Sequence, residues 1–257
     1  MKKQLLAGFV AALASFNAAA LTAGDLSFTA FNADEDGWAM VAFTDIAANT
    51  TLFITDNEWN GSAIGAGGAF NTGESHHRWV SGGSVIGAGT VIRFAATDKT
   101  TLSASHGTLT REAVAGSTNY GTANSNEVIY VYQGSSATAP THFVTAITNG
   151  SFAADGSLAG TGLANGTSAI TLNANFPTAS PDFGEYTGPR TGLASFAAYK
   201  PLVANLGNWT VDTANGAYAS IVPDTTAFSI TPVPEPESWA MLAAGLAVLG
   251  AARRRRA

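Results

Sequence analysis

Short runs in which apolar residues alternate with small or polar ones recur through most of the chain. Each run has a strand-like period of two or is rich in β-branched and aromatic residues, and clusters of Gly, Asn, Asp and Ser separate them. They lie at residues 26–31, 38–43, 51–55, 90–94, 127–132, 142–147 and 167–172. Only residues 194–206 carry a helix-like pattern, which Pro201 would break. The pattern predicts an all-β fold, an antiparallel β-sandwich.

Two segments that lead into predicted strands resemble each other. Residues 46–50 read IAANT and residues 86–90 read IGAGT. Asn49 and Gly89 occupy the same place, where a residue that tolerates a positive φ is favoured. The sequence therefore predicts two similar loop-to-strand entries.

The N-terminal segment has the layout of a secretory signal. Lys2 and Lys3 precede an apolar stretch at residues 5–14, and small residues follow. Ala18 and Ala20 stand where signal peptidase reads small side chains. We expect a signal peptide over residues 1–20, with signal peptidase as a partner and cleavage after Ala20.

The C-terminal segment has three parts in a fixed order. A Pro-rich motif comes first, an apolar run at 239–252 follows, and a basic cluster ends the chain; the motif is Val233, Pro234, Glu235 and Pro236, and the cluster is Arg253, Arg254, Arg255 and Arg256. This layout resembles the PEP-CTERM sorting signal of Gram-negative bacteria. The resemblance implies handling by the membrane protease-transpeptidase exosortase and delivery to the cell surface or the extracellular matrix.

The apolar run itself supports membrane insertion. It is shorter than the roughly 20 residues that cross a hydrocarbon core without adjustment. The arginines would hold its end on the cytoplasmic side, which leaves the preceding chain outside. The alternative is a C-terminal core helix of the folded domain. The sequence thus predicts three parts: a signal peptide (1–20), an extracellular domain (21–231) and a sorting signal with a transmembrane helix (232–257).

The N-terminal half of the predicted domain is similar to an uncharacterised bacterial extracellular module. Residues 24–28, 31–39, 55–61 and 86–92 carry the similarity. Their layout resembles immunoglobulin-like and lamin-tail-like sandwiches. Neither comparison implies a catalytic residue.

Charge and cysteine content limit the kinds of partner that the domain can bind and the interactions that can stabilise it. Residues 21–231 hold six basic and sixteen acidic residues, a net charge of −10, and the chain has no cysteine. So acidic a surface disfavours nucleic acid and is compatible with bound cations. Without disulfides, the domain depends on its core or on ions for stability.

One loop has the oxygen spacing of a calcium site. Asn32, Asp34 and Asp36 alternate and are followed by a glycine that permits a sharp turn. Phe43 stands where an EF-hand needs Glu, so residues 56–58 (Asp, Asn, Glu) are the nearest candidates to complete the shell. The alternative is an ordinary hairpin turn, and the two are compatible.

Other polar clusters give weaker signals. Residues 55–61 pair carboxylates with Trp59, which suits a sugar or a cation, or simply the end of a strand. Glu74 and His76 would share one face of a strand while His77 points to the other, so one metal ion could not easily take both histidines. The common nucleophile, phosphate-loop and zinc-protease motifs are absent from the sequence, so we expect no enzyme.

Together these observations predict an exported structural or adhesive protein of the cell surface or matrix, passing through the inner membrane during sorting. The alternatives are a calcium- or exopolysaccharide-binding module and a matrix-acting glycoside hydrolase.

Overall fold

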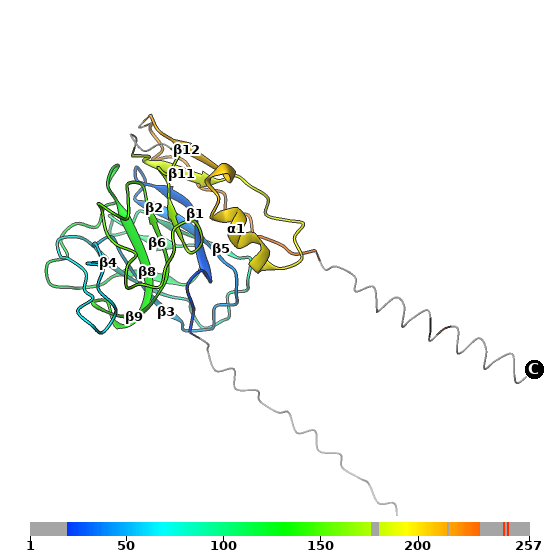
Figure 1. Ribbon diagram of the computed structural model, residues 1–257, viewed down its shortest axis with the longest axis horizontal. Coiled ribbons are helices and arrows are strands. Elements are labelled where there is room, and N and C mark those ends of the chain that lie inside the picture. The colour runs from blue at the N-terminus through cyan, green and yellow to red at the C-terminus, as the bar shows by residue number, and fades with distance from the viewer. Residues whose placement is uncertain (1–19, 176–179, 215, 232–243, 245, 247–257) are drawn as a thin grey trace, which may run out of the picture.

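The protein is a two-sheet β structure, seen in a computed structural model that describes residues 20–175, 180–214, 216–231, 244 and 246 (Figure 1). Within these residues, twelve strands form two six-stranded sheets. Ala18, the sorting motif and the apolar run at 239–252 lie outside the described residues, apart from residues 244 and 246. Among the residues described, no helix has the length and apolar character needed to span a membrane.

The first sheet is antiparallel throughout. Its order is β12-β11-β1-β2-β5-β6. The strands are β1 (Leu26–Asn32), β2 (Gly37–Ala42), β5 (Val91–Ala95), β6 (Ser103–Ala104), β11 (Phe183–Tyr186) and β12 (Trp209–Asp212). The first strand of the chain thus pairs with a strand near its end, with Ala30 opposite Glu185.

The second sheet corrects one expectation. Its order is β10-β9-β8-β3-β4-β7. The strands are β3 (Thr51–Thr55), β4 (His76–Val80), β7 (Thr108–Arg111), β8 (Val128–Ser136), β9 (Ala139–Thr148) and β10 (Ala169–Thr171). A purely antiparallel sandwich was wrong here, because β10 runs parallel to β9. The segment between them is long enough to bring the chain round so that β10 runs beside the last residues of β9, with Ala169 opposite Ala146.

The two sheets pack face to face. One continuous cluster of buried side chains draws on both of them: Phe28, Trp38, Met40, Ile92 and Phe94 from the first, and Leu52, Ile54, Trp79, Ile129, Val131, Val144 and Ile147 from the second. Burial of apolar area of this extent is the main force that holds the sheets together. The prediction of a mostly β protein with two stacked sheets is confirmed.

The outer face of the second sheet is also covered. Loops that follow β3 and β9 bring Trp59, Phe70, Phe152 and Leu163 over aromatic residues of the sheet. Trp59 is 2% exposed, and its indole N–H donates to the backbone oxygens of Ser62 and Ala159. It is therefore a core residue and offers no exposed platform for a sugar.

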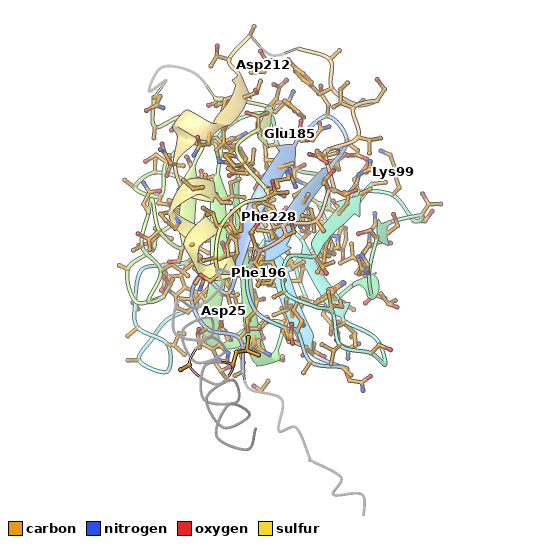
Figure 2. The ribbon with its side chains drawn as sticks, turned by 90° about the vertical axis from the view of Figure 1, so that its right-hand side faces the viewer. Asp25, Lys99, Glu185, Phe196, Asp212 and Phe228 are labelled. Atoms are coloured by element: carbon orange, nitrogen blue, oxygen red, sulfur yellow. The ribbon has the colours of Figure 1, made fainter. Side chains whose placement is uncertain are left out.

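The C-terminal part of the chain packs against the first sheet (Figure 2). It contains η1 (Phe196–Tyr199), α1 (Lys200–Val203) and η2 (Leu206–Asn208). Pro201 does not interrupt the helical segment. It lies in the first turn of α1, directly after η1, where the missing N–H is not needed. Phe228 is buried among Phe43, Tyr186 and Tyr199, which fixes the last segment of the domain.

The two similar loop segments meet in the structure. Ile46 and Ile86 exchange both backbone hydrogen bonds, at 2.8 and 3.0 Å. Asn49 and Gly89 have φ angles of 60° and 89°, as their place in the pattern predicts. The repeated segment thus positions one strand of each sheet, β3 and β5.

Candidate functional site

Three carboxylates converge at one end of the second sheet. Asp56 follows the last residue of β3, and Glu127 directly precedes β8. Glu74 lies two residues before β4. Because β3 lies between β4 and β8 and is antiparallel to both, its end meets the beginnings of its two neighbours. The topology therefore brings the three side chains together from distant parts of the sequence.

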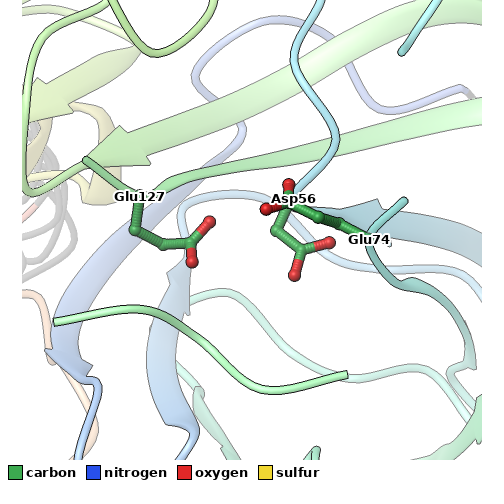
Figure 3. Close-up of side chains that lie close together, drawn as sticks. All are labelled: Asp56, Glu74 and Glu127. Atoms are coloured by element: carbon green, nitrogen blue, oxygen red, sulfur yellow. The ribbon is translucent and has the colours of Figure 1, made fainter. Parts of the chain in front are cut away.

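The carboxylates are close and largely withdrawn from solvent (Figure 3). One oxygen from each residue can be chosen so that all three lie within 4.8 Å of one another. Asp56 is 4% exposed and Glu127 is 3% exposed, whereas Glu74 is half-buried. Among the described residues, no other group of His, Cys, Asp and Glu is this compact.

Hydrogen bonds hold two of the carboxylates in place. Oδ1 of Asp56 accepts from the backbone N–H and the hydroxyl of Ser75, at 2.7 and 2.8 Å. Glu127 accepts from the backbone N–H of Ala123 at 2.6 Å and from that of Val128 at 3.1 Å. These donors orient the oxygens but do not neutralise the negative charge.

Burial makes this charge unfavourable. It raises the pKa of Asp56 to about 8, that of Glu74 to about 7 and that of Glu127 to about 9, and repulsion from neighbouring carboxylates adds to each. The ion pairs formed among the described residues involve other carboxylates, namely Asp25, Glu35, Asp98 and Asp224. The cluster thus favours either protons or a bound cation.

The donor set selects the kind of cation. Three carboxylates offer only oxygen atoms, which suit hard divalent ions such as calcium and magnesium. Calcium accepts six to eight oxygens in irregular geometry, whereas magnesium demands a near-ideal octahedron. A site assembled from three chain segments fits the more tolerant ion better.

The two neighbouring histidines do not join this cluster. His77 lies between the sheets beside Trp38, and its Nε2 is 3.3 Å from the backbone oxygen of Thr97. His76 faces Phe70 on the other side, and its Nδ1 is 3.1 Å from Oγ of Ser117. Burial lowers the pKa of each to about 4. The two rings thus lie on opposite faces of the sheet.

The residues predicted to bind calcium lie in the turn between β1 and β2, each with its own partner. Asn32 donates its side-chain amide to the backbone oxygen of Tyr218 at 3.0 Å. Asp34 accepts from the backbone N–H of Tyr218 at 2.6 Å. Asp36, which has a φ of 54°, accepts from the backbone N–H of Thr122 at 2.7 Å. These bonds describe a stabilised turn, and calcium at this loop stays a prediction.

The sequence offered little signal for the observed cluster. Asp56 was predicted only as a distant ligand for the loop at Asn32. Glu127 was assigned to a strand, and Glu74 drew notice only beside the histidines. The available signal was that each carboxylate lies within two residues of a strand end, but the sheet order that joins those ends cannot be derived from spacing.

Comparison with known proteins concerns the end of the chain. The family model of the PEP-CTERM protein-sorting motif matches residues 232–256. The chain carries this sorting motif. The PEP-CTERM motif indicates an exported surface protein that exosortase processes after transient membrane anchoring. Comparisons with curated proteins and with solved structures found no match.

The match includes the residues singled out from the sequence. Pro234 to Pro236 and Arg253 to Arg256 all fall inside it. It lies wholly beyond the two sheets. It therefore indicates where the protein is delivered and gives no information on the chemistry of the folded domain.

Proposed function

We propose that the protein is a structural or adhesive component of the cell surface or extracellular matrix of a Gram-negative bacterium, with no enzymatic activity. The observation that carries the proposal is the position of the PEP-CTERM motif, which begins at residue 232. The backbone N–H of Thr231 still bonds to Leu193 of the domain, at 2.9 Å. Removal of the motif would therefore leave the packed domain whole.

The N-terminal end supports export in the same way. Ala20 is exposed, whereas Leu21 is buried and hydrogen-bonded to Gln133. Cleavage by signal peptidase after Ala20 would leave Leu21 and its hydrogen bond to Gln133 in the released domain. Export and sorting would thus trim both ends at the limits of the fold.

Intact-mass measurement tests the sorting proposal. The full chain is produced in a Gram-negative host with exosortase and, as a control, in the same host lacking it. We expect the surface material to lack the C-terminal segment only in the first host. A mature species that still ends at Ala257 in both hosts would contradict the proposal. Replacing Arg253 to Arg256 by Ser should also retain the unprocessed form.

The burial of the carboxylates supports a role without catalysis. Retaining glycosidases place their two carboxyl groups about 5–5.5 Å apart, and inverting enzymes place them farther apart, beside an open cleft. Asp56 and Glu127 are nearly inaccessible, so a glycan could not reach them. Release of reducing sugar from the host's own matrix polysaccharide would contradict this part of the proposal.

The fold comparison drawn from the sequence remains part of the proposal. Two stacked sheets are compatible with an immunoglobulin-like or lamin-tail-like sandwich. Modules of this architecture present loops at the ends of the sheets for binding. Exopolysaccharide is one partner for such loops, and co-sedimentation of the protein with purified matrix polysaccharide tests it.

Calcium binding is the second candidate function, and the cluster of Asp56, Glu74 and Glu127 favours it. The three carboxylates have oxygen-only chemistry and form no ion pair with a described basic residue. A cation would relieve their repulsion and tie β3, β4 and β8 together. A ligand that binds only the folded state at a hundredfold excess over Kd stabilises it by about 2.7 kcal/mol.

Thermal unfolding of the full chain in detergent tests this second candidate. We expect millimolar calcium to raise Tm by several degrees more than sodium chloride of equal ionic strength. Glu74→Gln removes one charge from the half-buried member and should diminish the increment. Asp45→Asn, at an exposed carboxyl in the loop that precedes β3, is the matched control and should leave it. An equal response in both variants would contradict the site.

A further inference from the structure

Three carboxylates also lie at one end of the first sheet. Asp34 lies two residues after β1, Asp182 directly precedes β11, and Asp212 is the last residue of β12. Because β11 lies between β1 and β12 and is antiparallel to both, these three positions share one end of the sheet. The arrangement repeats, on different strands, the convergence at Asp56, Glu74 and Glu127.

Asp182 is the distinctive member. The residue is 0% exposed, and among the described residues no hydrogen-bond partner is found for either carboxylate oxygen. Asp212 and Asp34 are near enough for their negative charges to act on it. Burial raises the pKa of Asp182, and these two neighbours raise it further. A buried carboxylate that receives no donor is strongly unfavourable unless a proton or a cation is bound.

The neighbours of Asp182 are held as acceptors. The backbone N–H groups of Ala214 and Gly216 donate to Asp212 at 3.0 and 2.7 Å and lower the pKa of that residue. The backbone N–H of Tyr218 donates to Asp34. These bonds hold Asp212 and Asp34 as acceptors, whereas no described residue donates to the carboxylate of Asp182.

A segment of chain closes over this end of the sheet. The ring of Tyr218 stacks on Phe183, with centroids 4.4 Å apart and planes 8° apart. The side-chain amide of Asn32 donates to the backbone oxygens of Tyr218 and Ile221. Asp182 is therefore enclosed between the strand ends and the segment that follows β12.

We propose that Asp182, Asp212 and Asp34 bind a calcium ion at this end of the first sheet. Asp182 would contribute both free oxygens and Asp212 a third, while Asp34 would act through a bound water, since the three residues are less tightly grouped than the cluster at Asp56. The irregular oxygen shell of calcium tolerates such a mixture. The ion would fasten the segment around Tyr218 to β1 and β11.

This site is distinct from the loop predicted from the sequence. It keeps Asp34 but replaces Asp36, whose carboxylate is turned toward Thr122. It is also independent of the cluster at Asp56, because it uses the other sheet. The alternative for Asp182 is a proton shared with Asp212.

Calcium titration by calorimetry separates these alternatives on the full chain in detergent. The proposal expects Asp182→Asn to remove one bound calcium and to reduce the calcium-dependent rise in Tm. Asp45→Asn, an exposed carboxyl beyond the opposite end of the first sheet, is the matched control and should change neither. If a proton is shared instead, Asp182→Asn mimics the protonated acid, and unchanged calcium stoichiometry in this variant would overturn the proposal.

A second readout does not depend on the stability of the Asp182 variant. Terbium replaces calcium in oxygen sites and luminesces when a nearby aromatic ring is excited. We expect calcium-displaceable luminescence that falls several-fold in Tyr218→Phe and is unchanged in Tyr132→Phe, whose ring lies on the outer face of the second sheet. Equal signals in both variants would overturn the proposal. Loss of binding in Glu74→Gln but not in Asp182→Asn would reject this site and leave the cluster at Asp56 standing.

Discussion

The backbone N–H of Leu21 donates a hydrogen bond to Oε1 of Gln133, at 2.9 Å. The same oxygen lies 2.8 Å from Nε2 of His142, so one side chain joins the start of the domain to β8 and β9. Leu21 is buried, and Ala20 before it is exposed. The relationship gives the processed N-terminus a defined place in the fold.

The mature protein should begin at Leu21, and this contact should contribute to its stability. Because a hydrogen bond of this kind contributes about 1 kcal/mol, Gln133→Ala should lower the free energy of unfolding by roughly that amount. N-terminal sequencing of exported protein and chemical denaturation check the two statements. Ser135→Ala, an exposed change on the same strand, is the control and should be neutral. A mature N-terminus inside β1 would contradict the assignment.

Gly89 should not tolerate a side chain. Its φ is 89°, and a Cβ would lie 2.3 Å from the backbone oxygen of Phe228. Gly89→Ala should therefore lower the free energy of unfolding by more than about 2 kcal/mol, through strain and lost packing. Gly87→Ala is the matched control, because a Cβ there meets nothing within 4 Å. Similar melting temperatures for the two variants would show that the contact with Phe228 is not retained in solution.

The last buried aromatic of the domain should carry much of the stability of its C-terminal end. Phe228 is 3% exposed, so Phe228→Ala should reduce the free energy of unfolding by about 3–5 kcal/mol. Ile230 is 40% exposed, and Ile230→Ala should have a much smaller effect. Denaturant titration of both variants provides the comparison, and equal losses would argue against the packing described.

Stability without calcium should fall as pH rises from about 5 to 9, most steeply above pH 6.5. The folded-state pKa values of Asp56, Glu74 and Glu127 lie above those of the unfolded chain, so the folded state holds more protons and its stability falls as pH rises. Below about pH 6.5 the lowered pKa values of His76 and His77 act in the opposite direction, but these two groups offset only part of the effect of the three carboxyl groups.

Denaturant titrations in EGTA from pH 5 to 9 test this profile. Each carboxyl group that titrates contributes a slope of at most about 1.4 kcal/mol per pH unit. Glu74→Gln should flatten the alkaline side, whereas Asp45→Asn, at an exposed carboxyl, should leave it. Stability that rises steadily from pH 6.5 to 9 would contradict the raised pKa values.

Local patterns predicted much of this fold because they report single elements. Alternation marked seven of the strands to within a few residues, and the repeat at residues 46–50 and 86–90 marked two positive φ angles that the structure contains. The other five strands, β4, β6, β7, β11 and β12, are not among the predicted runs, since pairing with neighbours defines them more than their own composition does.

The carboxylate cluster could not be predicted for a related reason. Asp56 and Glu74 lie at the two ends of the connection between β3 and β4. Glu127 joins them only because β8 lies beside β3. That neighbour relation is a property of the whole sheet, decided by which apolar faces pack together. The spacing at Asn32 predicts a cation site within one loop. The observed carboxylate cluster is instead brought together by the order of strands in the second sheet.

The pairing of β1 with β11 determines when the domain can fold. Ala30 leaves the ribosome early, yet its partner Glu185 emerges only after most of the chain. Contacts between such distant residues form slowly, because a long loop must close before they stabilise anything. The first sheet therefore stays incomplete until β11 has left the ribosome, so a chain exported during synthesis would complete this sheet only after export.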